Sequence, residues 1–511
     1  MRFAAIVSFL LPLVAAKPAQ KGKTFSNVEI FDPPTNYRDP QVLYSRPLEL
    51  SDGTLLATWE NYSPEPPNVW FPIVKSKDGG KTWKEISKVK DTQNNWGLRY
   101  QPFLYELPRQ FGKFPKGTVL ISGSSIPSDL SQTLIEVYAS RDKGYTWEFV
   151  SHVALGGEAL PNHGLTPVWE PFLMTYKEKL ILYYSDQRDN ATHSQKMVHQ
   201  TTTDLKKWSK VVDDTKYADY YARPGMPTVA KLPNGEYIYA YEYGGGPNPP
   251  AGSTYWFPVY YRLSKDPQSF LNKPHHKLAT NDGTQPAGSP YVVWTPYGGK
   301  NGTIVLSCGT RSEIFTNQAL GDESAWKKWD VPQPAAYTRA LLTFKKNPDL
   351  LMIMGGGILP PADGKNTVSA SVVPLDTLDA GIDIITSTSP TNTPTSKMNF
   401  EMIFMRNRAA NGDLPSKIIR EVLRDPDSRS QGPGFNVNSR DEIQAVEDHM
   451  RTLETCLIMI MADQRIAADH QDPRCSPAEA GHLERVASSL RGALQTLREK
   501  RDRLVQERAN E

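Results

Sequence analysis

Two copies of the eight-residue pattern Ser-x-Asp-x-Gly-x-Thr-Trp constrain the fold of this chain more than any other feature of its sequence. They occupy Ser76–Trp83 and Ser140–Trp147. In such an octet the Asp carboxylate can accept hydrogen bonds from backbone N–H groups, and the Gly permits a positive φ. The Trp can then pack beneath the turn as an apolar anchor. Both octets are therefore interpreted as structural turns that carry no chemistry.

Looser copies of the octet extend this pattern into a repeat. The segments 204–208 and 266–270 keep the Asp and the closing aromatic residue but lose the Gly. The anchoring aromatic residues recur at intervals of about 60 residues, which is a repeat unit. They are Trp83, Trp147, Trp208, Phe270 and Trp329. Each unit holds short alternating runs separated by turns, which predicts four-stranded blades arranged radially as a β-propeller.

The number of blades follows from the last unit, which is incomplete. Five units run to about Trp329, and a sixth lacks a final strand. Its three runs are 337–344, 350–354 and 368–374. The segment Phe25–Phe31 precedes the first unit and can supply the missing strand, which closes the ring and removes an open sheet edge. The sequence thus predicts an all-β, six-bladed propeller over residues 17–385.

Three segments outside the propeller have different compositions. Residues 1–16 combine an early Arg, an apolar core and small residues at their end, which predicts a signal peptide and a secreted, extracellular protein. Residues 386–410 begin with a Thr/Ser/Pro-rich run, which is typical of a linker. Residues 411–511 contain capping boxes and a seven-residue leucine repeat, which predict a coiled-coil-like helical extension of unknown function. We expect the propeller to be monomeric and any association to run through these helices.

The overall composition excludes several function classes. A formal net charge of +2 over 511 residues favours neither a nucleic acid nor an acidic partner. No later run is long enough for a membrane helix. The three Cys residues form no disulfide framework, and no His/Cys cluster has zinc spacing, so no metal or cofactor is expected. Three glycosylation sequons begin at Asn61, Asn190 and Asn301.

Two carboxylates stand out as candidates for chemistry, because the inner strands of a propeller converge on its central channel. Glu170 lies at the start of the third unit, and Glu242 ends an inner strand of the fourth. Both are flanked by aromatic residues, with no Lys or Arg within three positions. An unpaired carboxylate is costly to bury, so it needs a partner or a purpose. Two such groups on neighbouring blades suit acid and nucleophile work on a glycosidic bond, although a strand-end carboxylate can also simply face water.

The octets resemble the Asp-box of the sialidase superfamily, and Arg46, in Ser45–Pro47, is similar to the superfamily's first-blade arginine signature. The wider pattern resembles fungal exo-α-1,5-L-arabinanases of glycoside hydrolase family 93 over residues 25–380. It consists of the segments 162–164, 168–171 and 241–246. The C-terminal part of the chain is not covered.

This resemblance implies a retaining exo-glycosidase that removes arabinobiose from the non-reducing end of linear arabinan. Carried over, Glu242 is the nucleophile, Glu170 is the general acid/base, and Tyr337 could donate a hydrogen bond to Glu242. The residues expected to bind the substrate are Arg46, His163, Trp169 and Arg339.

Two other functions fit the same sequence. A sialidase would use Tyr337 as its nucleophile, assisted by Glu242, with three arginines holding the substrate carboxylate. The candidates for those arginines are Arg46, Arg223, Arg311 and Arg339. A non-catalytic carbohydrate-binding propeller would keep the fold and use the Glu side chains as partners for sugar hydroxyls, because fold alone does not determine function.

Overall fold

The computed structural model describes residues 24–250, 255–359 and 365–376, together with isolated residues of helical conformation between 488 and 506. The predicted signal peptide and linker lie outside the described residues. So does the helical extension, apart from those isolated positions.

The described residues form six four-stranded antiparallel sheets, which we number as blades 1 to 6 along the chain. Blades 1 to 3 consist of β2 (Val42–Glu49), β3 (Leu55–Asn61), β4 (Phe71–Ser76) and β5 (Lys84–Val89); β6 (Leu98–Glu106), β7 (Val119–Ser125), β8 (Thr133–Ser140) and β9 (Glu148–Gly156); and β10 (Val168–Tyr176), β11 (Lys179–Asp186), β12 (Lys196–Thr202) and β13 (Val212–Thr215). Blades 4 to 6 consist of β14 (Arg223–Lys231), β15 (Tyr237–Gly244), β16 (Val259–Ser264) and β17 (His275–Lys277); β18 (Tyr291–Thr295), β19 (Thr303–Ser307), β20 (Ile314–Asn317) and β21 (Lys327–Trp329); and β22 (Ala340–Thr343), β23 (Leu350–Gly355), β24 (Val368–Pro374) and β1 (Phe25–Phe31). A short 3₁₀ helix, η1 (Glu323–Ala325), precedes β21.

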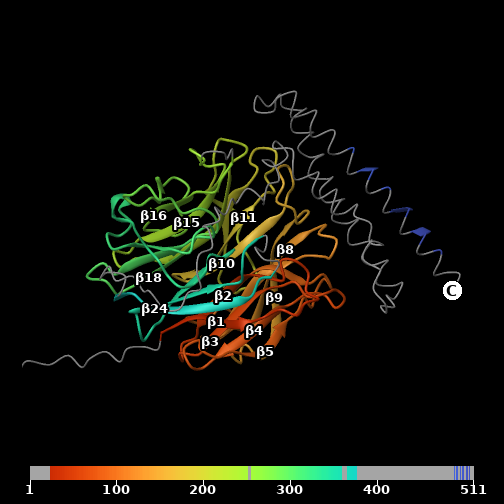
Figure 1. The fold of residues 1–511 in the computed structure, drawn as a ribbon, viewed down its shortest axis with the longest axis horizontal. Helices are drawn as coiled ribbons and strands as arrows, with labels where there is room; N and C mark the ends of the chain where they lie inside the picture. The colour runs from red at the N-terminus through yellow and green to blue at the C-terminus, as the bar shows by residue number, and fades with distance from the viewer. Residues whose placement is uncertain are drawn as a thin grey trace, which may run out of the picture.

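The ring closes through the N-terminal strand, as the sequence predicted. Strand β1 pairs antiparallel with β24, with Phe25 opposite Val372 and Phe31 opposite Val368. In Figure 1 the red strand β1 and the teal strand β24 accordingly belong to the same blade, although they are the first and last strands of the propeller. The first strands of successive blades contact one another around the whole ring, from β2 through β6, β10, β14 and β18 to β22 and back to β2. The sheet edges that remain are the short outer strands of the blades.

The octets form the tight turns expected of them at the outer side of the blades. In the first octet, Asp78 accepts hydrogen bonds from the N–H groups of Lys81 and Thr82, each at 3.0 Å, and from the Thr82 hydroxyl at 2.6 Å. Ser76 Oγ accepts from the N–H of Gly80 at 2.9 Å, and Gly80 has a φ of 97°. These bonds lower the pKa of Asp78 to about 2.

Two of the closing Trp residues also join their turns to the preceding blade. Trp147 Nε1 donates to Ser87 Oγ on β5 at 3.1 Å, and Ser87 donates to the carbonyl of Gly144 at 2.5 Å. One blade later, Trp208 Nε1 donates to Ser151 Oγ at 3.0 Å, and this serine donates to the carbonyl of Leu205 at 2.7 Å. The looser copy of the octet therefore keeps the connection between blades after losing its Gly.

A second repeated feature lies on the channel side. Five residues at or just before the inner strands have a left-handed backbone: Tyr44, Gln101, Glu170, Met226 and Ser289. The strand pairing shifts by a β-bulge at the first four of these positions. Non-glycine residues rarely adopt positive φ, and such strain clusters at functional sites.

The N–H group of each of these bulge residues donates to an acceptor on the preceding blade. The pairs are Tyr44 N to Tyr337 O at 3.2 Å, Gln101 N to Glu60 Oε1 at 2.8 Å, Glu170 N to Gln101 Oε1 at 3.2 Å, Met226 N to Glu170 Oε2 at 2.7 Å and Ser289 N to Glu242 Oε2 at 2.7 Å. The bulges thus supply a ring of backbone donors to the channel, and three of their acceptors are carboxylates.

Candidate active site

The inner strands enclose a small pocket in the channel of the propeller. Its lining combines aromatic, proline and methionine side chains with one carboxylate and one guanidinium. The lining residues are Tyr44, Arg46, Phe103, Glu170, Pro171, Phe172, Met226, Pro227, Thr228 and Pro290. They come from the first strands of blades 1 to 4 and from the segment before β18, which places the pocket where the blades converge. A concave, mostly apolar site with a few convergent polar groups is the usual form of a ligand site.

Glu170 points into this pocket from the bulge of β10. Its side chain is 9% exposed. Its Oε2 accepts hydrogen bonds from the Ser185 hydroxyl at 2.6 Å and from the Met226 N–H at 2.7 Å. Its φ of 63° is the left-handed conformation of the bulge, so the backbone is held in a strained form that aims the carboxylate across the channel.

Glu242 reaches the same region from the end of β15 on the neighbouring blade. Its Oε2 accepts one hydrogen bond, from the Ser289 N–H at 2.7 Å. Gly225 links it to Glu170, because this glycine is paired with Glu242 across the sheet. A Cβ atom on Gly225 would lie 3.3 Å from Glu170 Oε2 and 2.8 Å from Gln195 Nε2, so a larger residue here would displace these side chains.

Burial dominates the electrostatics of this pair. Loss of solvent raises the pKa of Glu170, and hydrogen bonds from Ser185 and Met226 and the charge of Arg223 oppose that rise. Burial, followed by the charge of Glu170, raises the pKa of Glu242 to about 8, against the opposing Ser289 hydrogen bond and the charge of Arg223. Two close carboxyls in a dry site cannot both ionise readily, so the pair titrates as a unit. At neutral pH the pair can therefore hold a proton, as acid and nucleophile chemistry requires.

Tyr337 lies among these carboxyls, as the sequence suggested, but it does not make the expected hydrogen bond. Burial raises the pKa of its hydroxyl well above the usual value, followed by the charges of Glu170, Glu242 and Glu60. Its ring lies 6.3 Å from that of Tyr44. Among the described residues its hydroxyl donates no hydrogen bond to Glu242, which instead accepts from the Ser289 backbone.

The structure brings Arg46 into the pocket and leaves Arg339 outside it. The Arg46 guanidinium lies 3.9 Å from the centre of the Tyr44 ring and 5.0 Å from that of Tyr291, and it donates to the Thr338 hydroxyl. Arg339 is fully buried. Its guanidinium donates to three backbone carbonyls, those of Ser312, Gln333 and Glu313. This geometry indicates that Arg339 braces loops, and it corrects the expectation that this residue binds substrate.

Trp169 and His163 lie beside the pocket-lining residues rather than among them. Trp169 is 6% exposed, and its indole N–H donates to Gln187 Oε1 at 3.0 Å. The same oxygen accepts from Arg223 Nη2 at 3.0 Å, so the indole supports the arginine that faces both carboxylates. The His163 ring contacts the Ser194 hydroxyl and lies edge-on, 5.2 Å from the Tyr221 ring. The role of either residue in substrate binding stays a prediction.

Glu60 is a further channel carboxylate, which the sequence reasoning did not single out. It lies near the end of β3, as Glu242 lies near the end of β15. Glu60 is paired with Leu43 immediately before the bulge of β2, and Glu242 is paired with Gly225 immediately before the bulge of β14. This equivalence was readable in the sequence, because both residues follow an aromatic residue at the end of a blade's second strand.

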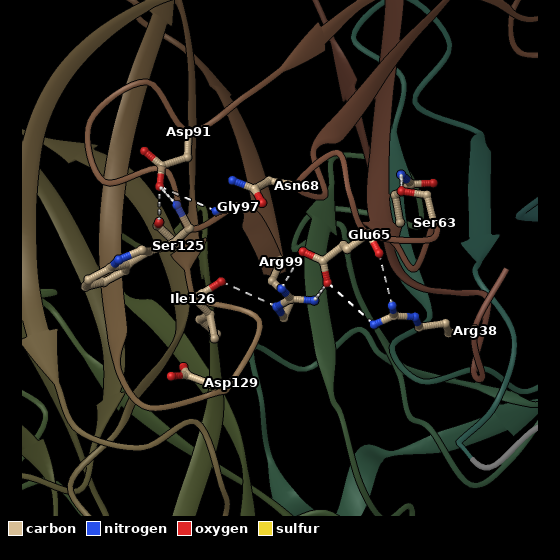
Figure 2. A network of polar contacts seen from close by, with 12 residues as sticks. Arg38, Ser63, Glu65, Asn68, Asp91, Gly97, Arg99, Ser125, Ile126 and Asp129 are labelled. Carbon is tan, nitrogen blue, oxygen red and sulfur yellow. Dashed lines mark hydrogen bonds and ion pairs between the residues drawn. The ribbon is translucent and has the colours of Figure 1, made fainter. Parts of the chain in front are cut away.

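The loops of blades 1 and 2 are held near the site by two polar clusters, shown in Figure 2. Glu65, in the loop after β3, makes a two-bond ion pair with Arg99 on β6, at 2.9 and 3.0 Å. Arg38 approaches the same carboxylate at 3.7 Å (Figure 2). In the second cluster, Asp91 accepts from the Ser125 hydroxyl at 2.7 Å. The buried Glu65–Arg99 pair fixes this loop against the neighbouring blade.

Neither a metal-binding cluster nor a membrane-spanning helix occurs among the described residues. They contain no group of three or more His, Cys, Asp or Glu side chains that could hold a metal ion. Across the same residues, no helix has the length and apolar character needed to cross a membrane.

Solved structures identify the relatives of this fold. A glycoside hydrolase family 93 α-L-arabinofuranosidase of Fusarium graminearum, in complex with arabinobiose, is 92% identical, covers 70% of this chain and 99% of its own, and has a TM-score of 0.69. The E242A mutant of the Fusarium enzyme, in complex with an iminosugar inhibitor, is 91% identical over the same shares, also with a TM-score of 0.69. An α-L-arabinanase of Penicillium chrysogenum complexed with arabinobiose is 56% identical over 69% of this chain and 99% of its own, with a TM-score of 0.67.

Comparisons of the chain with protein-family models and with curated proteins found no match. The structural relatives are sufficient, because an identity of 92% over nearly the whole of a solved enzyme leaves no room for a different family. Together with the paired carboxyls in the channel, they show that this chain is a glycoside hydrolase and belongs to family 93.

Proposed function

We propose that this protein is a secreted, retaining exo-α-1,5-L-arabinanase that releases arabinobiose from the non-reducing end of linear arabinan. The observation that carries the proposal is the pair Glu170 and Glu242 on neighbouring blades. Glu170 lines the channel pocket, and Glu242 is paired with Gly225, whose backbone lies close to the Glu170 carboxylate. The identity of the sugar is inferred from relatives whose structures were solved in complex with arabinobiose.

In this mechanism Glu242 attacks the anomeric carbon while Glu170 gives its proton to the leaving oxygen. The bond between the sugar and the rest of the chain breaks, and a glycosyl ester to Glu242 forms. Glu170 then takes a proton from water, which attacks the same carbon and releases the disaccharide with its original configuration. Arg223 offsets the negative charge of the pair, and Arg46 lies where it can contact the bound sugar.

The hydrogen bonds of the two carboxyls bear on which of them has which role. Glu170 accepts two of them and Glu242 accepts one, so the bonding alone favours ionised Glu170 and protonated Glu242. The family resemblance implies the opposite order. We assign Glu242 as nucleophile, with the proton held by Glu170 once a glycosidic oxygen lies against it. Azide decides between the orders, because it should replace the nucleophile of a Glu242→Ala variant and give the glycosyl azide of inverted configuration.

The sialidase alternative is weakened by where the arginines lie. Arg311 forms an ion pair with Glu313 at 2.5 Å, and Arg339 is occupied by backbone carbonyls. Only Arg46 and Arg223, of the four candidates, act on the channel carboxyls. A sialidase needs three arginines converging on one carboxylate, so this arrangement argues against it.

Product analysis tests the proposal. Linear arabinan should give arabinobiose as the first product, and NMR should show that the product keeps its anomeric configuration before it equilibrates. A sialoside should give no product. Release of a sialic acid, or a product of inverted configuration, would contradict the proposal.

The ends of the chain complete the proposed function. Residues 1–16 would direct secretion, and the helical extension at 411–511 would be dispensable for catalysis. The Fusarium structure supports the second point, since 99% of that enzyme is covered by 70% of this chain. A protein ending at Thr386 should therefore keep full activity and remain monomeric, and its activity and mass in solution can be compared with those of the full chain.

A further inference from the structure

The strongest feature that the proposed mechanism does not use is the buried carboxylate of Glu60. This side chain is 2% exposed. One oxygen accepts from the Gln101 N–H at 2.8 Å, and the other accepts from the Tyr62 hydroxyl at 2.7 Å. A buried carboxylate is costly unless its bonds serve the structure around it, so its neighbours indicate its role.

Those neighbours form a continuous chain of hydrogen bonds to the catalytic pair. Glu60 on blade 1 holds the backbone of Gln101 on blade 2. The side chain of Gln101 then accepts from the backbone N–H of Glu170 on blade 3, at 3.2 Å. Each N–H in this chain belongs to a bulge residue, with φ of 57° at Gln101 and 63° at Glu170. Loss of the first acceptor therefore leaves the second strained residue less firmly held.

We propose that Glu60 is a positioning residue, which fixes the left-handed backbone of Glu170 through Gln101 and thereby aims the Glu170 carboxylate at the bound sugar. This inference rests on the proposed function, because it assigns Glu170 a catalytic role. Misplacement of a catalytic group by about 1 Å costs on the order of 100-fold in rate, so a residue outside the reacting atoms can control turnover.

Glu60 also acts on Glu170 through its charge. Burial raises the pKa of Glu60 to about 7, and the hydrogen bonds from Tyr62 and Gln101 and the charge of Arg46 oppose this rise, while the charge of Glu170 adds to it. The interaction is mutual, so ionised Glu60 disfavours ionised Glu170 and helps it to keep its proton. Four tyrosine hydroxyls also face this carboxylate, those of Tyr44, Tyr62, Tyr100 and Tyr337.

Two substitutions separate geometry from charge. Glu60→Gln keeps an oxygen for the Gln101 N–H and removes the charge. We expect its kcat to fall by less than about tenfold and the alkaline limb of its kcat/KM profile to move to lower pH, because Glu170 then loses its proton more readily. Glu60→Ala removes the anchor, and we expect its kcat to fall by roughly 10- to 100-fold with little change in KM.

Glu136→Gln is the matched control. Glu136 is another fully buried glutamate whose pKa burial raises to about 7, and its carboxylate bonds Asn94, Tyr138 and His152, away from the channel. This variant should lose stability but keep the kcat and pH profile of the wild type. Gln101→Met is a second test, because it breaks the link and keeps the charge of Glu60. Its kcat should fall without a shift of the alkaline limb.

The outcomes are distinct. If both Glu60 variants match Glu136→Gln in kcat and in pH profile, the proposal is wrong. It is also wrong if Glu60→Ala raises only KM, since Glu60 would then bind substrate. All variants are measured on the substrate that the wild type cleaves best, so a wild type that releases no arabinobiose would refute the proposed function and leave this comparison decisive.

Discussion

The outer turns and the inner channel of this propeller both hold carboxylates with backbone N–H groups, yet their acidities shift in opposite directions. Asp78, in an exposed outer turn, accepts bonds from two N–H groups and from a threonine hydroxyl, and its pKa falls to about 2. Glu242, in the channel, accepts one such bond, and its pKa rises to about 8. In the exposed turn, desolvation opposes the fall in pKa, but several hydrogen bonds to the anion together outweigh it. In the channel, desolvation and the charge of the second carboxylate outweigh the one bond that remains.

The difference shows that, of the two repeated features, the outer turn stabilises the fold and the inner bulge positions the reacting groups. The outer turn repeats its residues in blades 1 and 2, and the looser copies in blades 3 and 4 keep its Asp and its closing aromatic residue. The inner bulge repeats only its backbone, and residues as different as Tyr44, Gln101 and Met226 occupy it. A common donor at each blade can therefore hold a different acceptor, and at blades 3 and 4 these acceptors form the reacting pair.

Removal of either inner carboxylate should have the largest effect on activity. Glu170→Gln should lose roughly 10²- to 10⁴-fold in kcat on arabinan, because the leaving oxygen then receives no proton. The loss should be far smaller on an aryl glycoside whose leaving group needs no proton. Glu242→Gln should be inactive on both substrates and form no glycosyl ester, which mass spectrometry can check.

The corresponding outer change is the control for this comparison. Asp142→Asn alters the second octet, whose carboxylate accepts N–H bonds in the same way as Asp78. It should leave kcat unchanged on both substrates. A large loss of activity in Asp142→Asn would show that the outer turns are part of the catalytic machinery.

Tyr337→Phe should have the next largest effect. The charges of all three channel carboxyls act on its hydroxyl, which among the described residues makes no hydrogen bond to Glu242. A bond that it forms to a charged group during the reaction would be worth about 1.5–3 kcal/mol, so kcat should fall by roughly 10- to 100-fold and persist. If this variant is as inactive as Glu242→Gln, and a sialoside is a better substrate of the wild type than arabinan, Tyr337 is the nucleophile and the sialidase mechanism stands.

The outer features were predictable from sequence because their contacts are local. All hydrogen bonds of the Asp78 turn join residues within a few positions of one another. The residue types at the fixed positions of the octet therefore predict the geometry of the turn. The period of the anchoring aromatic residues then predicted the blade count. Even the closure by Phe25–Phe31 followed from counting strands.

The inner features were only partly predictable, because their contacts join distant segments. Glu170 and Glu242 were recognised by their aromatic, cation-poor surroundings. Glu60 was missed, since its importance depends on Gln101, which is 41 positions away. The expectation that Arg339 lies in the site was wrong. Its guanidinium donates to backbone carbonyls of separate loops, and no local sequence pattern predicts those contacts.

Gly225→Ala should have a smaller effect on rate than loss of a carboxylate. The added methyl would lie 2.8 Å from Gln195 Nε2 and 3.3 Å from Glu170 Oε2, so both side chains must shift. We expect kcat to fall by roughly tenfold or more with the fold retained, because small displacements of reacting groups are costly. Gly235→Ala, where nothing lies within 4 Å of the added methyl, tests the cost of a positive φ without crowding and should leave kcat unchanged. Equal rates for Gly225→Ala and the wild type would mean that the two carboxyls are not held by this close approach.

The smallest expected effect concerns stability, and it tests the opposition between the two regions directly. The folded pKa of Glu242, about 8, lies above its ordinary value of 4.5, so the native state keeps a proton that the unfolded state has released. Native stability should therefore fall as pH rises from about 4.5 to about 8, and Glu242→Gln should remove that dependence of stability on pH.

Asp78 is the reverse case, because its folded pKa of about 2 lies below its ordinary value of 3.8. Its contribution should be present above about pH 4 and disappear as pH falls towards 2, and its exposure limits the contribution to less than about 1 kcal/mol. Thermal denaturation across this pH range tests both expectations. Glu242→Gln should become more stable relative to the wild type as pH rises. Asp78→Asn should be slightly less stable than the wild type above about pH 4, and this difference should disappear at low pH. Parallel pH trends in the two variants would show that burial does not separate the channel carboxylates from the outer ones.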